Sequence, residues 1–418
     1  MRTAASAIAA HFRGFPPRFW WLWAGAVVSA FATFVFLFLA VYLAARGFSP
    51  RDIGLLVAAD GVGSLAAAPV GGWLADRIGR RPTLVAALAL CAAAAAFLAF
   101  ARAPPLVVPG VLAFGLASTM TFPALFAIVA DVVPERDLER GFGLLYWANN
   151  LGVAFSAAVG GAIGERSWTG LFLADAATTL AFAAIVWQRV PESRPGPTLR
   201  PDDTAAASPA RGYGAVLRDG PFVGFWVVFV VYLLVFWQFQ VAAPLAMARD
   251  GHGPAAIGRI LMANGIVIFA LQPFSARLVA RFDPARVLAV AAALVGTGYG
   301  AYAICDGVAS YAVATAIWSV GEVLTTPVAS ALVARLAPPD LRGRYQGAYG
   351  FAWGAGRTVA PVAGGAALEA LGPTALWVGC LGMGLTAALG HLALGSSRRR
   401  GTVERRQARS RRTDEHGA

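Results

Sequence analysis

Four ionisable side chains stand inside long apolar stretches of this sequence, where a charge is costly: Asp60, Asp175, Glu322 and Arg357. A charge in the middle of a membrane-crossing helix costs about 2.5–3.5 kcal/mol on insertion scales, so such a residue usually faces a partner or a cavity and has a function. The chemistry available to these four is ion pairing and the uptake and release of a proton. The carboxylates can be protonated, whereas the arginine stays charged.

The apolar stretches themselves are long enough to cross a bilayer. Of the 418 residues, 58% are hydrophobic and 13% are charged, well below the roughly 25% charged residues of soluble domains. This composition disfavours a soluble enzyme, a nucleic-acid binder and a disordered scaffold. Twelve stretches reach the roughly 17–25 apolar residues that a spanning helix needs: 19–45, 53–75, 82–101, 105–130, 141–164, 168–188, 221–247, 256–279, 287–304, 308–334, 345–368 and 374–394. The runs are continuous rather than alternating, so we expect an all-α integral membrane protein and not a strand barrel.

The basic residues predict the orientation. All 34 are arginines, and 27 of them fall in the N-terminus, alternate loops, the central linker and the C-terminal tail, against six on the other side. By the positive-inside rule, both termini are cytoplasmic in a multi-pass protein of the cytoplasmic membrane. The three cysteines and four histidines are scattered along the chain. We therefore expect no disulfide and no metal site.

An internal repeat divides the chain. At an offset of 204 residues, Pro123 meets Pro327 and Gly160 meets Gly364, and glycines, prolines and arginines coincide from residue 17 to residue 161. We expect an N-terminal six-helix bundle over 1–190, a cytoplasmic linker over 191–220, a C-terminal six-helix bundle over 221–395 and a basic, disordered cytoplasmic tail over 396–418. Six spans separate the copies, so both bundles have the same orientation. Parallel halves of this kind are typical of transporters, with the substrate site between them.

A charged turn joins the second and third predicted spans. It reads Gly71-Gly72-Trp73-Leu74-Ala75-Asp76-Arg77-Ile78-Gly79-Arg80-Arg81-Pro82. Its carboxylate can accept an arginine or helix N–H groups, and its arginines can anchor at anionic headgroups. The spacing resembles the G-x-L-x-D-R-x-G-R-R motif of the major facilitator superfamily. Together with the twelve spans and the repeat, this resemblance covers nearly the whole chain except the tail.

The resemblance implies the major facilitator fold, with two pseudo-symmetric six-helix bundles, and a secondary transporter that works by alternating access. In that family the motif's Asp and Arg help to latch the cytoplasmic ends of the two halves. The residues that the resemblance assigns to this gating motif are Gly72, Asp76, Arg77, Gly79, Arg80, Arg81 and, as a charge partner, Asp131. The second copy has Ala280 at the Asp position, so the implied latch is asymmetric.

A second motif bears on the direction of transport. Proton-driven drug exporters carry G-x-x-x-G-P-x-x-G-G in the fifth span. Here residues 152–161 read GVAFSAAVGG, without the central Gly-Pro, while residues 356–365 read GRTVAPVAGG, which is closer. The exporters' fourth-span arginine is also absent, since residues 109–117 contain no Arg. The chain is most similar to the multidrug-efflux, drug–proton antiporter type, with these departures; close packing of helices by small residues is the alternative explanation.

The intramembrane charges predict a coupling device. At 1.5 Å per residue, Asp60, Glu322 and Arg357 lie about 18–24 Å from the cytoplasmic ends of their helices. The resemblance implies that the second span faces the eleventh across the halves. We therefore expect Arg357 to pair with Glu322 within the C-terminal half and with Asp60 across the halves in one state. Protonating either carboxylate would then release Arg357 and bias the conformational equilibrium; a static buried pair is the alternative. Asp175 lies about 10 Å from the outer end, so an external rim position competes with a coupling role.

Further polar and aromatic residues are predicted to line the substrate cavity: Asn149, Gln238, Gln240, Asn264, Trp318, Thr325 and Trp353. Trp318, Glu322 and Thr325 share one helical face, and Asn264 is the repeat partner of Asp60. Phe36 and Trp237 would add an apolar wall. For the polar members, interhelical hydrogen bonding is the alternative.

The expected function is therefore proton-coupled export of a small, fairly apolar organic compound. We expect a monomer whose partners are that substrate and the lipid bilayer, with the proton as coupling ion, no other cofactor and no nucleic acid. Proton-coupled uptake of a nutrient or metabolite is the alternative direction. A membrane-embedded enzyme, a channel and a ligand sensor are alternatives from other classes, and the lack of clustered His, Asp or nucleophiles at one face argues against the enzyme.

Overall fold

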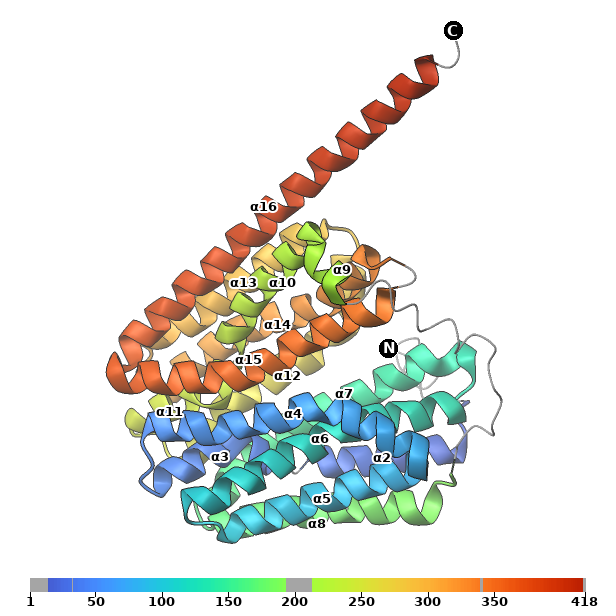
Figure 1. Ribbon diagram of the computed structural model, residues 1–418. Helices are drawn as coiled ribbons and strands as arrows, with labels where there is room; N and C mark the ends of the chain where they lie inside the picture. The colour runs from blue at the N-terminus through green and yellow to red at the C-terminus, as the bar shows by residue number, and fades with distance from the viewer. Residues whose placement is uncertain (1–13, 32, 193–212, 339–340, 416–418) are drawn as a thin grey trace, which may run out of the picture.

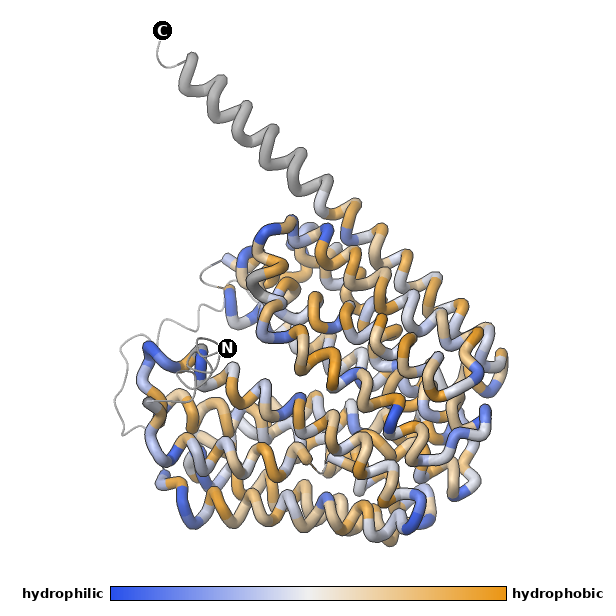
Figure 2. The backbone as a smooth tube through the Cα atoms, turned by 180° about the vertical axis from the view of Figure 1, so that it is seen from behind, coloured by the Kyte–Doolittle hydropathy of each residue, from blue (hydrophilic) through white to orange (hydrophobic). Residues whose placement is uncertain are grey.

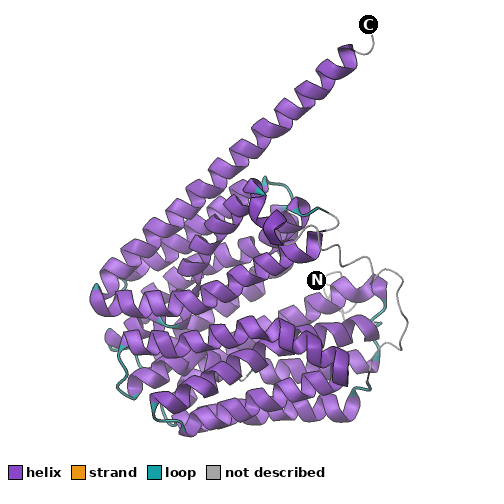
Figure 3. Ribbon diagram, viewed as in Figure 1, coloured by secondary structure: helices purple, strands orange, loops and turns teal. Residues whose placement is uncertain are grey.

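The computed structural model describes residues 14–31, 33–192, 213–338 and 341–415, and every regular element among them is a helix (Figures 1 and 3). Most of the predicted linker, residues 193–212, lies outside the described residues. The N-terminal half contains α2 (Pro17–Ala30), α3 (Phe34–Ala45), α4 (Pro50–Ile78), α5 (Arg80–Phe100), α6 (Pro104–Val132), η1 (Glu135–Asp137), α7 (Leu138–Gly164) and α8 (Trp168–Arg189).

The C-terminal half repeats this order. It contains α9 (Tyr213–Arg218), α10 (Gly220–Phe236), η3 (Trp237–Gln240), α11 (Ala242–Arg249), α12 (Pro254–Val279), α13 (Pro284–Ala301), η4 (Tyr302–Ile304), α14 (Val308–Leu336), α15 (Arg342–Ala370) and α16 (Gly372–Glu415). Prolines open many of these helices, because the first turn has no use for the N–H that proline lacks.

Eleven segments of the described chain are long and apolar enough to span a membrane. The remaining predicted span, 345–368, corresponds to α15, a 29-residue helix that is rich in glycine and contains Arg357. It is less apolar than the others because it packs lengthwise on α4 and carries that charge. The prediction of an all-α membrane fold is confirmed.

Two predicted spans are interrupted. The stretch predicted as 19–45 divides into α2 and α3, and the stretch predicted as 221–247 divides into α10, η3 and α11. The two breaks fall at similar positions of the repeat. In each half, the end of the first span is therefore a separate short helix, α3 or α11. α3 and α11 contact each other across the halves.

The tail also differs from the expected disorder, since α16 continues without a break to Glu415. The reason is local: no proline follows the last apolar turn, and the added residues are mostly Arg, Gln, Ala and Glu. These are strong helix formers, so they extend a helix that the preceding span has already nucleated.

Two helix pairs join the halves, α4 with α15 and α7 with α12. Glycines let them approach closely: a methyl group added to Gly365 would lie 2.2 Å from the carbonyl oxygen of Pro50, and one added to Gly161 would lie 2.5 Å from that of Pro254. These two contacts correspond under the 204-residue repeat. The seams are therefore pseudo-symmetric.

The two halves lie together at the end that carries α3 and α11 and diverge toward the end that carries the α4–α5 turn and α9 (Figures 1 and 2). We call the second end the arginine-rich face, since it holds the turn with Arg77, Arg80 and Arg81, and the first end the opposite face. Along both seams, the close glycine contacts belong to the part nearer the opposite face.

Candidate functional site

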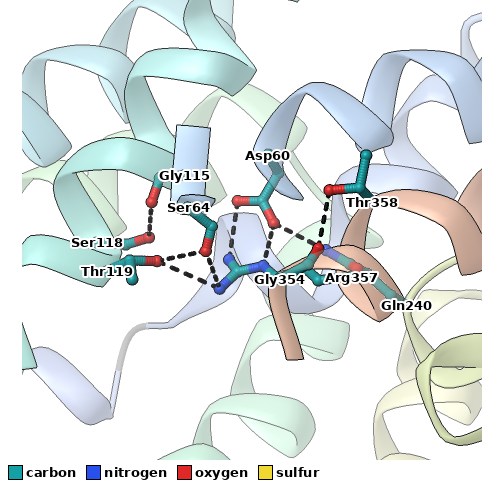
Figure 4. Close-up of polar contacts among 9 residues, drawn as sticks. All are labelled: Asp60, Ser64, Gly115, Ser118, Thr119, Gln240, Gly354, Arg357 and Thr358. Carbon is teal, nitrogen blue, oxygen red and sulfur yellow. Dashed lines mark hydrogen bonds and ion pairs between the residues drawn. The ribbon is translucent and has the colours of Figure 1, made fainter. Parts of the chain in front are cut away.

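The centre of the α4–α15 seam holds an ion pair between the two halves. Arg357 on α15 donates from Nε to Asp60 Oδ2 at 2.5 Å and from Nη2 to Asp60 Oδ1 at 2.9 Å (Figure 4). The Asp60 side chain is 3% exposed and that of Arg357 is 15% exposed. A two-pronged arginine–carboxylate pair of this kind is stronger and more directional than a single contact. The predicted pairing of Arg357 with Asp60 across the halves is thus present.

Polar groups from both halves complete the surroundings of this pair. Arg357 Nη1 donates to the hydroxyl oxygens of Ser64 and Thr119, each at 3.4 Å, and Gln240 Nε2 donates to Asp60 Oδ2 at 3.3 Å. Ser64 and Thr119 also share a 2.8 Å hydrogen bond that joins α4 to α6. A buried charge is tolerated only when its remaining donors and acceptors find partners, and here they do.

Aromatic rings cover the open side of the guanidinium. The Arg357 Cζ atom lies 5.1 Å from the centre of the Phe36 ring and 5.7 Å from that of Trp237. Trp237 in turn makes edge-to-face contacts with Phe36 and Trp353. These rings provide an apolar surface next to a charged pair, and the contacts to the cation contribute attraction through the ring faces.

Glu322 does not join this pair. Its Oε2 accepts a 2.8 Å hydrogen bond from Asn264 Nδ2, which also donates to Ser319 Oγ at 2.9 Å. No ion pair within the described part of the chain involves Glu322. The expected pairing of Arg357 with Glu322 is therefore absent from this conformation. The reason is that Arg357 points across the seam to α4, whereas Glu322 on α14 faces α12 in its own half.

The remaining predicted cavity residues divide into two groups. Gln240 reaches the ion pair, and Trp353 lies among the rings beside it. Trp318 and Thr325 are instead buried in the C-terminal half, where Trp318 Nε1 donates to the hydroxyl of Tyr302 at 3.0 Å. Thr325 donates to a carbonyl of its own helix.

Two further polar residues of the predicted cavity, Gln238 and Asn149, form no hydrogen bond with the ion pair among the described residues. Gln238 donates from Nε2 to the carbonyl oxygens of Leu234 and Ala360, at 2.8 and 3.4 Å. Asn149 is half-buried on α7. Sequence reasoning also missed Ser64 and Thr119. The signal for Ser64 was available, because it stands one helical turn after Asp60 and must share its face.

Asp175 is buried in the N-terminal half and is not a member of the ion pair. It is 3% exposed on α8, and its Oδ2 accepts the backbone N–H of Val35 at 2.9 Å. Thr33, at the start of α3, provides no side-chain cap. Asp175 therefore supplies the acceptor that the first turn of α3 needs after the break in the first span. Of the two alternatives for Asp175, the external rim position does not fit this burial, because the break places the start of α3 inside the bundle.

The gating motif makes its contacts within the N-terminal half. Arg80 pairs with Asp131 on α6 and donates from its backbone N–H to Glu192 Oε1 at 3.0 Å. Arg81 donates to the carbonyl of Trp187 on α8, and its guanidinium lies 4.5 Å from that ring.

The other residues of the motif are Gly72, Asp76, Arg77 and Gly79. Gly79 ends α4 with φ +101°, a conformation that favours glycine. Gly72 has open space around it, and the exposed Arg77 lies over the ring of Trp73 at 5.2 Å. Asp76 lies in the last turn of α4. These contacts join the helices of the arginine-rich face within the N-terminal half.

The fold and this arrangement define a membrane transporter, and the chain belongs to the Major Facilitator Superfamily. The sequence profile of that family matches residues 22–248 and again residues 225–415, so each half matches it. The solved structure of the nucleoside transporter NupG superimposes with a TM-score of 0.74 at 13% identity, covering 91% of this chain and 99% of that one. A D-xylose–proton symporter gives 0.70 at 17% identity, over 89% and 96%. These likenesses confirm the fold.

Three relatives of the chain are transporters or resistance proteins of bacteria. The MFS-type transporter YqjV of Bacillus subtilis is 27% identical, over 85% of this chain and 87% of the relative. A Na⁺, Li⁺, K⁺/H⁺ antiporter of Planococcus maritimus is 25% identical over 78% and 84%. The multidrug resistance protein MdtH of Aeromonas hydrophila is 24% identical over 66% and 68%. The chain is a transporter of this superfamily and not an enzyme.

Proposed function

We propose that this transporter exports small, fairly apolar organic compounds in exchange for protons, by alternating access in the cytoplasmic membrane. The observation that carries the proposal is the Asp60–Arg357 pair, because it joins the two halves at the seam where they must separate. Opening the opposite face would break both of its hydrogen bonds. The pair therefore stabilises one conformation only, and anything that neutralises Asp60 shifts the balance between conformations.

Glu322 is the proposed proton-carrying carboxylate. It accepts a hydrogen bond from the Asn264 amide and pairs with no arginine among the residues that the structure describes. When Arg357 is released from Asp60, the Glu322 carboxylate on α14 of the same half is an anion with which Arg357 can pair. Exchange of Arg357 between the two acids would link the protonation of Glu322 to the conformational change.

The test is transport in proteoliposomes with an imposed pH gradient, comparing the wild type with Glu322→Gln. We expect pH-driven accumulation to be lost in the variant while counterflow of substrate survives. Glu135→Gln, which removes a carboxylate at the arginine-rich face, is the matched control and should transport as the wild type does. If Glu322→Gln and Asp60→Asn both keep full pH-driven transport, proton coupling through these residues is wrong.

The substrate class is supported by the rings of Phe36, Trp237 and Trp353 beside the ion pair and by the multidrug resistance protein among the relatives. A substrate screen should therefore begin with hydrophobic aromatic compounds. The antiporter among the relatives favours a second candidate, exchange of Na⁺ or K⁺ for protons. Quenching of a trapped pH-sensitive dye on addition of Na⁺, K⁺ or an organic compound separates the two. The sign of the pH change also separates export from proton-coupled uptake.

The expected setting of the protein is a monomer with both termini in the cytoplasm. The arginine distribution along the chain supports this orientation. Accessibility of engineered cysteines to an impermeant thiol reagent on intact cells tests it, since cysteines in the α4–α5 turn should stay unlabelled.

A further inference from the structure

Two glutamates make matching contacts across the halves at the opposite face. Glu165 follows the last residue of α7, and its Oε1 accepts the backbone N–H of Ala255 in α12 at 3.2 Å. Glu369 lies in the last turn of α15, and its Oε2 accepts the backbone N–H of Arg51 in α4 at 3.0 Å. Both donors and both acceptors are exactly one repeat apart, at an offset of 204 residues. The two contacts are therefore copies of one interaction.

Each contact is physically a helix cap supplied by the other half. α4 begins at Pro50 and α12 begins at Pro254, so the next residue offers the first backbone N–H of its helix. That N–H has no partner inside the helix, and the helix start carries partial positive charge. A carboxylate is the favourable acceptor there, and in both cases it comes from the facing bundle.

Other charged side chains of the same face bond within their own half. Arg249 on α11 donates to the carbonyl of Leu368, Arg166 donates to that of Ala162, and Arg46 lies over the ring of Tyr42. The two glutamates thus differ from these neighbours in reaching across. Glu165 also lines a cavity of about 740 Å³, whose walls include Pro50, Ile53, Trp168, His252 and Pro254.

We propose that Glu165 and Glu369 are positioning residues that form a paired gate at the opposite face. Each hydrogen bond exists only while the halves are closed there, and both must break when that face opens. They therefore stabilise the conformation that diverges at the arginine-rich face, without contacting the central ion pair. The proposal rests on alternating access, and it is independent of the coupling ion and of the substrate.

The experiment measures the distance between spin labels on the two halves. Arg102 and Ile304 are exposed near turns of the opposite face, one in each half, and both are replaced by labelled cysteines after Cys91, Cys305 and Cys380 have been removed. Glu165→Ala and Glu369→Ala should each reduce the ratio of the short-distance to the long-distance population about fivefold, the usual effect of losing one helix cap. Because the sites are separate, the double variant should show about a 25-fold reduction.

Two further variants keep the result interpretable. Glu165→Gln and Glu369→Gln retain an acceptor oxygen and should shift the ratio less than the alanine variants do. Asp52→Asn is the matched control, since that carboxylate lies in the first turn of α4 and accepts from Ser49 in its own half; it should leave the ratio unchanged. The proposal is overturned if the double alanine variant keeps the wild-type distribution, or if Asp52→Asn shifts it equally. Neither result depends on proton coupling, so failure here is distinct from failure of the proposed function.

Discussion

Asp60 and Asn264 occupy equivalent positions of the repeat, yet Asp60 binds a residue of the other half and Asn264 binds one of its own half. Asp60 on α4 binds Arg357 of the other half, whereas Asn264 on α12 binds Glu322 of its own half. The two seams are thus similar in backbone and different in charge. One seam contains an ion pair between the halves, and the other carries a neutral amide that binds an acid of its own half.

Removing one partner of the Asp60–Arg357 ion pair should destabilise the protein more than removing both. Asp60→Asn leaves the Arg357 guanidinium buried without its anion, so we expect the free energy of unfolding to fall by about 3–5 kcal/mol. Replacing both residues, as Asp60→Asn with Arg357→Gln, removes the stranded charge and should recover most of that loss. Thermal unfolding in detergent measures both effects. Equal loss in the single and double variants would contradict the role of the pair.

Asp175 should behave as a structural cap and not as a coupling residue. Asp175→Ala removes the acceptor from the N–H of Val35, and we expect it to lower the free energy of unfolding by about 0.5–2 kcal/mol. Asp175→Asn keeps an acceptor oxygen and should retain both stability and pH-driven transport. A loss of pH-driven transport in the asparagine variant, at unchanged stability, would instead indicate a coupling role.

Much of the fold could be predicted from the sequence because membrane spans can be identified from the length and composition of apolar stretches. The positions of the spans and the repeat followed from apolar runs and glycines. The cross-half pair of Asp60 with Arg357 followed from the cost of buried charge together with the family resemblance, which implies that the second span faces the eleventh. The breaks within the first span of each half did not follow, since Phe31 to Thr33 and Trp237 to Gln240 carry no proline or glycine. What stabilises the first break is the distant Asp175.

The partner of Glu322 could not be predicted for a related reason. Helical spacing places Trp318, Glu322 and Thr325 on one face, but it does not say which helix that face meets. The structure sets α12 against that face, so Asn264 and not Arg357 binds Glu322, and Trp318 and Thr325 become part of the interior. Choosing between these partners requires the packing of whole helices, which residue spacing alone leaves open.

Two glycines of α15, Gly365 and Gly350, differ in the space around them, so their alanine variants form a matched pair. A methyl group on Gly365 would lie 2.2 Å from the backbone oxygen of Pro50, whereas nothing lies within 4 Å of one on Gly350. We expect Gly365→Ala to force the seam apart and lower the free energy of unfolding by about 1–3 kcal/mol. Gly350→Ala should be neutral or slightly stabilising, because alanine is the better helix former. Similar unfolding temperatures for the two variants would contradict this account of the seam.

The contact between Arg80 and Asp131 should matter for transport more than for stability. Their side chains are 26% and 25% exposed, so solvent screens the pair and its loss should change the free energy of unfolding by no more than about 1 kcal/mol. Because Asp131 also fixes the gating motif to α6, Asp131→Asn should still slow substrate transport by about fivefold or more, the size of a typical coupling between states.

The exchanged pair, Arg80→Asp with Asp131→Arg, tests whether this contact itself is responsible. Reversing both charges keeps the attraction between α5 and α6, so it should restore transport toward the wild-type rate if the ion pair positions the motif. Initial rates in proteoliposomes, normalised to the amount of folded protein, provide the measurement. Wild-type rates in Asp131→Asn, or an exchanged pair as slow as the single variant, would show that the motif acts through groups other than this pair.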